Sequence, residues 1–88
     1  MSIDLAIERI GYFSSKIDEI TQKVSVLEID LLGTGEEDKA AKQDIKAQLA
    51  RLNFQLGLCK EFIEFWKQVI QTTLNLIKSL QELAQGAR

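Results

Sequence analysis

Large apolar residues recur at alternating steps of three and four along most of this chain. This spacing puts them on one side of an α-helix and is typical of helices that pack lengthwise against each other. The first series consists of Ile3, Ala6, Ile10, Phe13, Ile17, Ile20, Val24, Leu27 and Leu31. It predicts one helix over residues 3–32, with Ser2 as a candidate N-cap. The sequence contains no proline, so nothing in this range forces a helix to end.

A second series of the same kind predicts a helix over about residues 36–85. Its members are Ile45, Leu49, Leu52, Leu56, Cys59, Ile63, Trp66, Ile70, Thr73, Ile77, Leu80 and Ala84. Gly57 leaves an alternative open, in which the helix breaks near this residue and the chain forms a three-helix bundle. The continuous helix is favoured, because the series crosses Gly57 in phase and no polar turn former flanks it.

The segment between the two series has the sequence GTGEED, residues 33–38, and carries helix stop and start signals. Gly33 is placed to adopt the left-handed conformation that closes a helix. Thr34 and Glu37 have the spacing of a capping box. These signals predict a turn at residues 33–35, and so short a connection makes the two helices antiparallel neighbours. The expected fold class is all-α: a single domain, residues 1–88, formed by a coiled-coil helical hairpin with a longer second helix.

The two predicted helices differ in length. At 1.5 Å per residue, about 30 residues span roughly 45 Å and about 50 residues span roughly 75 Å. Folding back around Thr34 brings Ile3 opposite a position near residue 65. The second helix is therefore expected to lack a neighbour within the hairpin from Trp66 onward.

This unpaired part is also the most apolar part of the second helix. A second apolar stripe lies beside the series of residues 45–84. Burying the eight large side chains of the unpaired part, which lie between Trp66 and Leu83, would contribute on the order of 10–20 kcal/mol. A partner is therefore expected to cover them. The predicted protein–protein interface consists of Leu58, Phe62, Phe65, Trp66, Val69, Ile70, Leu74, Leu76, Ile77, Leu80 and Leu83.

Composition and motifs give no indication of catalysis or ligand binding. The chain has no histidine and one cysteine, and the turn lacks the lysine of a phosphate-binding loop. We therefore expect no enzymatic activity, no cofactor and no metal site, with Cys59 packed as a small apolar residue. A net charge of −2 with interspersed signs argues against a nucleic-acid partner.

Two further features bear on location. No run of about 18 uncharged apolar residues occurs, so no membrane span is expected. The N-terminal segment has early acidic residues and no cationic region, unlike a signal peptide. A cytoplasmic location is expected.

Two functions are consistent with this pattern. The first is a structural subunit, a homo-oligomer that assembles through the apolar face of residues 58–84 into a helical bundle or filament. The second is a small helical chaperone or adaptor, whose apolar face binds an amphipathic segment of a heterologous helical protein.

The segment FQLGLCKEFIEFWKQVI, residues 54–70, resembles the second helix of type III secretion needle subunits. The resemblance lies in the spacing of Phe54, Leu56, Phe62, Ile63 and Phe65. Proteins of that family are small helical hairpins that stack into a hollow filament. The resemblance therefore implies a filament subunit that is exported to the cell surface. The chain departs from the family in its GTGEE turn, where the family tends to carry Asn or Pro, and in having Cys59 and Trp66.

Overall fold

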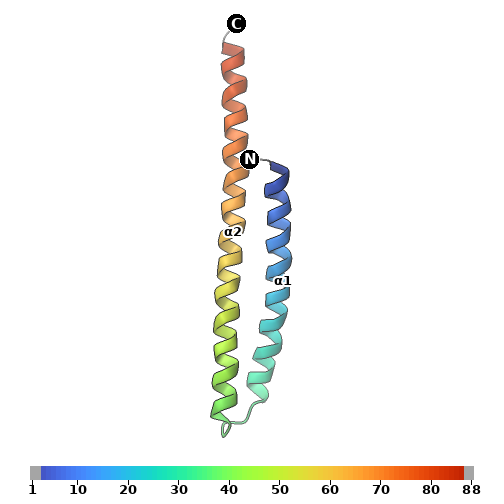
Figure 1. Ribbon diagram of the computed structural model, residues 1–88, viewed down its shortest axis with the longest axis vertical. Helices are drawn as coiled ribbons and strands as arrows, with labels where there is room; N and C mark the ends of the chain where they lie inside the picture. The colour runs from blue at the N-terminus through green and yellow to red at the C-terminus, as the bar shows by residue number, and fades with distance from the viewer. Residues whose placement is uncertain (1–2, 87–88) are drawn as a thin grey trace.

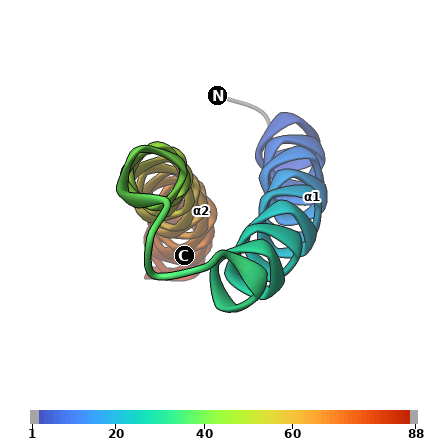
Figure 2. The same ribbon diagram turned by 90° about the horizontal axis from the view of Figure 1, so that it is seen from below.

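The computed structural model describes residues 3–86 and shows two helices joined by a short loop (Figure 1). Helix α1 spans Ile3–Gly33 and helix α2 spans Lys39–Gly86. They run antiparallel and side by side, and α2 continues well beyond the start of α1 (Figures 1 and 2). The predicted all-α helical hairpin with a longer second helix is therefore confirmed. Ser2, the candidate N-cap of α1, lies outside the described residues.

The hairpin is strongly elongated. Its principal extents are 79 × 16 × 15 Å and its radius of gyration is 21.3 Å, whereas a compact domain of this length has a radius of gyration of about 12 Å. The accessible surface is 6887 Å² for 10.0 kDa, against about 5,200 Å² for a compact monomer of that mass. Two paired helices bury only one side of each, so most side chains remain in contact with solvent.

The contact between α1 and α2 is formed by the two apolar series. Every member of the first series is buried or half-buried, and so is every member of the second series as far as Thr73. Ala6, Ile20 and Cys59 are the most deeply buried of the described residues. Phe13 stacks on Phe62 across the helix pair, with ring centroids 5.0 Å apart and planes inclined by 27°.

Helix α2 passes through Gly57 without interruption, so the alternative three-helix bundle is wrong. No glycine among the described residues has a positive φ. Gly57 therefore does not use the freedom that would let it end a helix. A Cβ atom added there would meet nothing within 4 Å.

The connection differs from the predicted turn, because residues 34–38 separate the helices and α2 begins at Lys39. Gly33 is the last residue of α1 and does not adopt a left-handed conformation. The Thr34 hydroxyl donates a hydrogen bond of 2.8 Å to the carbonyl of Asp30, within the last turn of α1. Thr34 therefore satisfies an unpaired carbonyl at the end of α1 and does not start α2.

Asp38 is the N-cap of α2. Its Oδ1 accepts a hydrogen bond of 3.1 Å from the backbone N–H of Ala41, three residues on. The predicted capping box of Thr34 and Glu37 is therefore wrong. Both Thr34 and Asp38 are competent caps, and a hydroxyl can accept from the next helix or donate to the preceding one.

The longer connection shifts the register of the hairpin by about one helical turn. Leu5 and Trp66 line the same groove, and residues of α2 are half-buried as far as Thr73. The expectation that α2 is unpaired from Trp66 onward is therefore wrong for Trp66, Val69 and Ile70. It holds for residues 74–86, all of which are exposed. We call residues 74–86 the overhang.

The packing of α1 on α2 predicts that Ile20→Ala destabilises the hairpin far more than Ile29→Ala. Ile20 is 7% exposed and Ile29 is 68% exposed. Truncating a buried Ile to Ala lowers the free energy of unfolding by about 2–5 kcal/mol. Truncating an exposed Ile changes it by no more than about 0.5 kcal/mol. Urea denaturation followed by circular dichroism, at matched protein concentration, measures both. Equal losses would contradict the packing described here.

The continuity of α2 predicts that Gly57→Ala stabilises the protein by about 0.5–1 kcal/mol, because alanine loses less backbone entropy in a helix. Gly11→Ala in α1 is the matched comparison, since a Cβ atom there also meets nothing within 4 Å. Thermal unfolding measures the change. A lower melting temperature for Gly57→Ala alone would indicate that the chain bends at residue 57.

Candidate protein–protein interface

The overhang carries five large apolar side chains in contact with solvent. Leu74, Leu76, Ile77, Leu80 and Leu83 are between 43% and 70% exposed. Lys78 and Glu82 are the charged residues between positions 68 and 86. Each is two positions from Leu80 and so lies about 160° around the helix from it. The overhang is therefore an amphipathic helix whose apolar side has no neighbour among residues 3–86.

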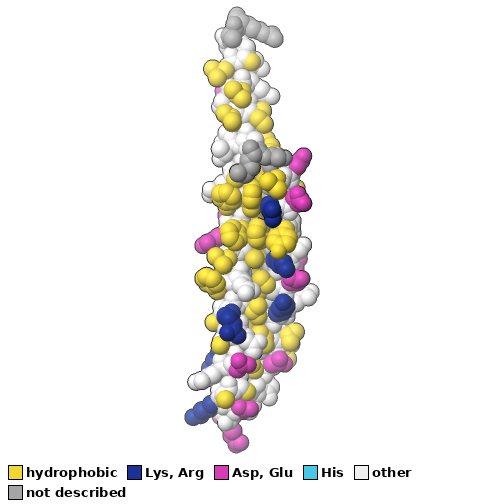
Figure 3. Space-filling view, in the orientation of Figure 1, with side chains coloured by type: hydrophobic (Ala, Val, Ile, Leu, Met, Phe, Trp, Pro, Cys, Tyr) yellow, Lys and Arg dark blue, Asp and Glu magenta, His cyan; other side chains and the backbone are white. Residues whose placement is uncertain are grey.

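A second apolar stripe runs along α2 from the paired part of the hairpin into the overhang. In the paired part it includes Leu58, Phe62 and Phe65, which are exposed, and Val69, which is half-buried. Figure 3 shows hydrophobic side chains gathered where the first half of α1 meets α2, and continuing along the protruding end of α2. Of the predicted interface residues, Trp66, Val69 and Ile70 are half-buried beside α1, and the others are exposed to solvent.

An aromatic groove lies between the helices at this level. It is lined by Leu5, Arg9, Phe13, Glu61, Phe62, Phe65 and Trp66. The stacked rings of Phe13 and Phe62 join its two sides. Trp66 meets Phe65 edge to face, with centroids 5.2 Å apart and planes inclined by 75°. Arg9 and Glu61 supply one charge of each sign.

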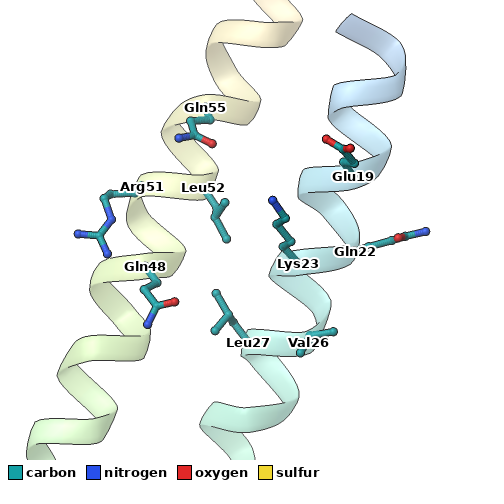
Figure 4. Close-up of a pocket in the computed structure, with 9 residues that line it drawn as sticks. All are labelled: Glu19, Gln22, Lys23, Val26, Leu27, Gln48, Arg51, Leu52 and Gln55. Carbon is teal, nitrogen blue, oxygen red and sulfur yellow. The ribbon is translucent and has the colours of Figure 1, made fainter. Parts of the chain in front are cut away.

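A second groove lies between the middle of α1 and the first half of α2 (Figure 4). We call it the polar-rimmed groove. Leu27 and Leu52 extend toward each other between the helices, and Lys23 reaches into the same space, while Gln22 and Arg51 point away. Val26 and three polar residues complete the lining: Glu19, Gln48 and Gln55.

Basic residues recur along the side of α1 that borders both grooves. Arg9, Lys16 and Lys23 follow one another at intervals of seven residues, and such a spacing keeps them on one side of a helix. Lys16 lies 3.2 Å from the carboxylate of Glu19 and 5.7 Å from the ring centroid of Tyr12. The hydrogen bond from Lys16 to Glu19 and the charge of that carboxylate raise the pKa of Lys16 above its ordinary value.

The polar residues that could suggest chemistry are occupied in structural roles. Cys59 is a free, buried thiol in the contact between α1 and α2. The Thr73 hydroxyl donates a hydrogen bond of 2.8 Å to the carbonyl of Val69 in its own helix. Among residues 3–86, no group of three or more His, Cys, Asp or Glu side chains is placed to hold a metal ion.

Neither α1 nor α2, over the described part of the chain, is long and apolar enough to cross a membrane.

The sequence pattern predicts only residues of α2 for this candidate surface, whereas residues of α1 also line it. Leu5 and Arg9 line the aromatic groove from α1, and neither belongs to the first apolar series. A signal was present in the sequence, since Leu5 and Tyr12 are large residues seven positions apart on one side of the helix. Leu5 borders the aromatic groove because of the register between α1 and α2, and a pattern within one helix does not contain that register.

No protein-family model, curated protein or solved structure matches the chain.

Proposed function

We propose that this protein is a non-enzymatic structural subunit that self-assembles through the apolar face of residues 58–84. The observation that carries the proposal is the overhang, with five large apolar side chains exposed and its two charges on the opposite side. A helix with an uncovered apolar side of this size promotes association in water. The absence of a neighbour for it among the described residues supports a contact between molecules.

The magnitude of this effect favours a contact that uses more than one overhang. A fully buried large apolar side chain contributes about 1.5–3 kcal/mol, so five that start half-exposed offer roughly 4–8 kcal/mol. Association costs an estimated 4–15 kcal/mol in lost freedom of motion. One overhang that packs against a surface without exposed apolar residues would therefore bind weakly. Two overhangs in one contact, with the stripe of Leu58, Phe62 and Phe65, would exceed that cost.

Two forms of assembly follow from the same surface. A contact that is identical on both molecules closes into a two-fold dimer, whereas a head-to-tail contact produces an open helical filament. The resemblance of residues 54–70 to type III secretion needle subunits supports the filament form, and in that case the protein would act outside the cytoplasm, at the cell surface. Three of the residues in that resemblance, Phe54, Phe62 and Phe65, are exposed and free to contact a neighbouring molecule.

Self-assembly predicts that Ile77→Asp dissociates the particle while the helix content of each chain is retained. Ile77 is 43% exposed on the apolar side of the overhang, and a carboxylate there would lose hydration on assembly. Asn75→Asp is the matched control, because it adds the same charge on the polar side. Sedimentation velocity gives the mass and far-ultraviolet circular dichroism gives the helix content. Wild-type protein that remains a monomer at 100-fold different concentrations would refute the proposal.

A second candidate function is a small chaperone or adaptor, and the polar-rimmed groove is the observation that favours it. Leu27 and Leu52 form an apolar floor between the helices, with Lys23 reaching over it and Val26 on the α1 side of the lining. Such a lining suits an amphipathic helix that carries acidic residues beside its apolar side. In this case the heterologous helix, and not a second copy, would be the partner.

A chaperone or adaptor function predicts that an acidic amphipathic helical peptide binds the protein. Lys23→Glu is then expected to weaken this binding at least tenfold. Lys60→Glu is the matched control, since Lys60 is exposed and does not line either groove. Fluorescence anisotropy of a labelled peptide measures the affinity. Equal affinity for the two variants, or no binding by the wild-type protein, would count against an adaptor function.

A further inference from the structure

The chain carries two apolar surfaces that are exposed over the described residues: the overhang and the aromatic groove. The apolar side of the overhang is wide, because Leu74 and Leu83 lie on opposite flanks of Ile77 and Leu80. A helix with so wide an apolar side is covered by two neighbouring helices and not by one. The aromatic groove presents two neighbouring helices, α1 and α2, whose apolar side chains Leu5, Phe62 and Phe65 are exposed between them.

These two surfaces cannot meet within one molecule over the described residues. Both lie on the same uninterrupted helix, α2, and the overhang extends away from the groove along the helix axis (Figure 1). Phe65 and Leu76, for example, are separated by eleven residues, which is about 16 Å of helix. A second copy of the chain supplies each surface to the other.

We propose that the overhang of one molecule packs as a third helix into the aromatic groove of a second molecule, and that the exchange is reciprocal. This inference rests on the proposed self-assembly and specifies its geometry. A reciprocal exchange requires the two α2 helices to run antiparallel, because only a two-fold axis gives each overhang the same groove. Each overhang then lies parallel to α1 and antiparallel to α2 of the other molecule.

The stripe on α2 sets the register of this contact. An antiparallel pairing that places Leu58 opposite Leu83 of the second copy also places Phe65 opposite Leu76, because each step is one heptad along its helix. The two-fold axis then passes close to Val69, which lies opposite Thr72 of the second copy. In this register Leu58 and Phe65 meet large residues of the overhang, whereas Phe62 lies opposite Ser79.

The charges of both surfaces permit this contact. Lys78 and Glu82 lie on the outer side of the overhang, so neither is taken out of water. Arg9 and Glu61 border the groove and have opposite signs. Burial of an unpaired charge is the usual obstacle to such packing, and neither charge of the overhang is buried in this contact.

The exchange uses both surfaces of each copy. Each copy contributes the five large apolar residues of its overhang and the seven residues that line its groove, and the two-fold axis brings each set against the other. The contact continues the stacking of Phe13 on Phe62 that already joins α1 to α2. The overhang of the second molecule would therefore pack beside the apolar contact that already holds α1 and α2 together.

Disulfide trapping tests the register. In a Cys59→Ala background, the pair Phe65→Cys and Leu76→Cys should give a covalent dimer on mild oxidation, seen by non-reducing electrophoresis. A bond within one chain is impossible, because the two positions are about 16 Å apart on one helix and a disulfide needs Cα atoms within about 7 Å. Phe65→Cys with Asn75→Cys, which points to the polar side, is the matched control and should stay monomeric on the gel.

The other outcomes overturn the inference in distinguishable ways. If the Cys59→Ala parent sediments as an oligomer but the Phe65–Leu76 pair does not crosslink, the proposed function stands and this geometry is wrong. A ladder of covalent species larger than a dimer would indicate head-to-tail assembly and contradict the reciprocal dimer. If the Cys59→Ala parent sediments as a monomer, both the proposed self-assembly and this geometry are refuted.

A second measurement does not depend on introduced cysteines. Trp66 is the single tryptophan of the chain and lines the aromatic groove. Leu83 is seventeen residues from it, about 25 Å along α2. Leu83→Asp should therefore shift the Trp66 emission to longer wavelength only if the overhang of another molecule covers the groove. If the wild-type protein is an oligomer and Leu83→Asp leaves the emission maximum unchanged, the inference is overturned.

Discussion

The structure depends on one apolar contact between two helices of unequal length. Helix α1 has 31 residues and α2 has 48, and the two series of apolar residues pair only where both helices are present. Beyond Thr73 the second series continues in phase on α2 but has no counterpart from α1. The section of α2 that pairs with α1 and the overhang are therefore parts of one continuous helix.

Partial burial is the main energetic feature of this molecule. Most members of the two series are half-buried, and of the described residues only Ala6, Ile20 and Cys59 are buried. The ion pairs Lys16–Glu19 and Glu64–Lys67 are exposed, and such pairs contribute only about 0–1 kcal/mol. Apolar contacts therefore hold the hairpin, and an assembly that completes their burial would stabilise the fold itself. The measured stability of such a protein depends on its concentration.

The grooves between the helices show how a two-helix fold offers binding surfaces. Two helices alone leave a furrow along each side of their contact, and a third helix is what fills it in larger bundles. The aromatic groove and the polar-rimmed groove belong to this furrow, but they differ in chemistry: the first is floored by Phe13 and Phe62, and the second has Lys23 over aliphatic side chains. The two grooves therefore differ in the side chains that they expose.

The sequence by itself determined the helices, because periodicity, the absence of proline and the phase across Gly57 act locally along each segment. It also determined that the end of α2 is apolar on one side. Only the tertiary structure decided the helix caps and the register, since Thr34 and Asp38 are both competent N-caps and the choice between them depends on how the helices meet. That choice set the length of the connection, moved Trp66 and Ile70 beside α1, and brought Leu5 to the groove of Phe62. A pattern within one helix carries no information about its alignment with another, which is why the α1 side of the groove emerged only when the two helices were packed together.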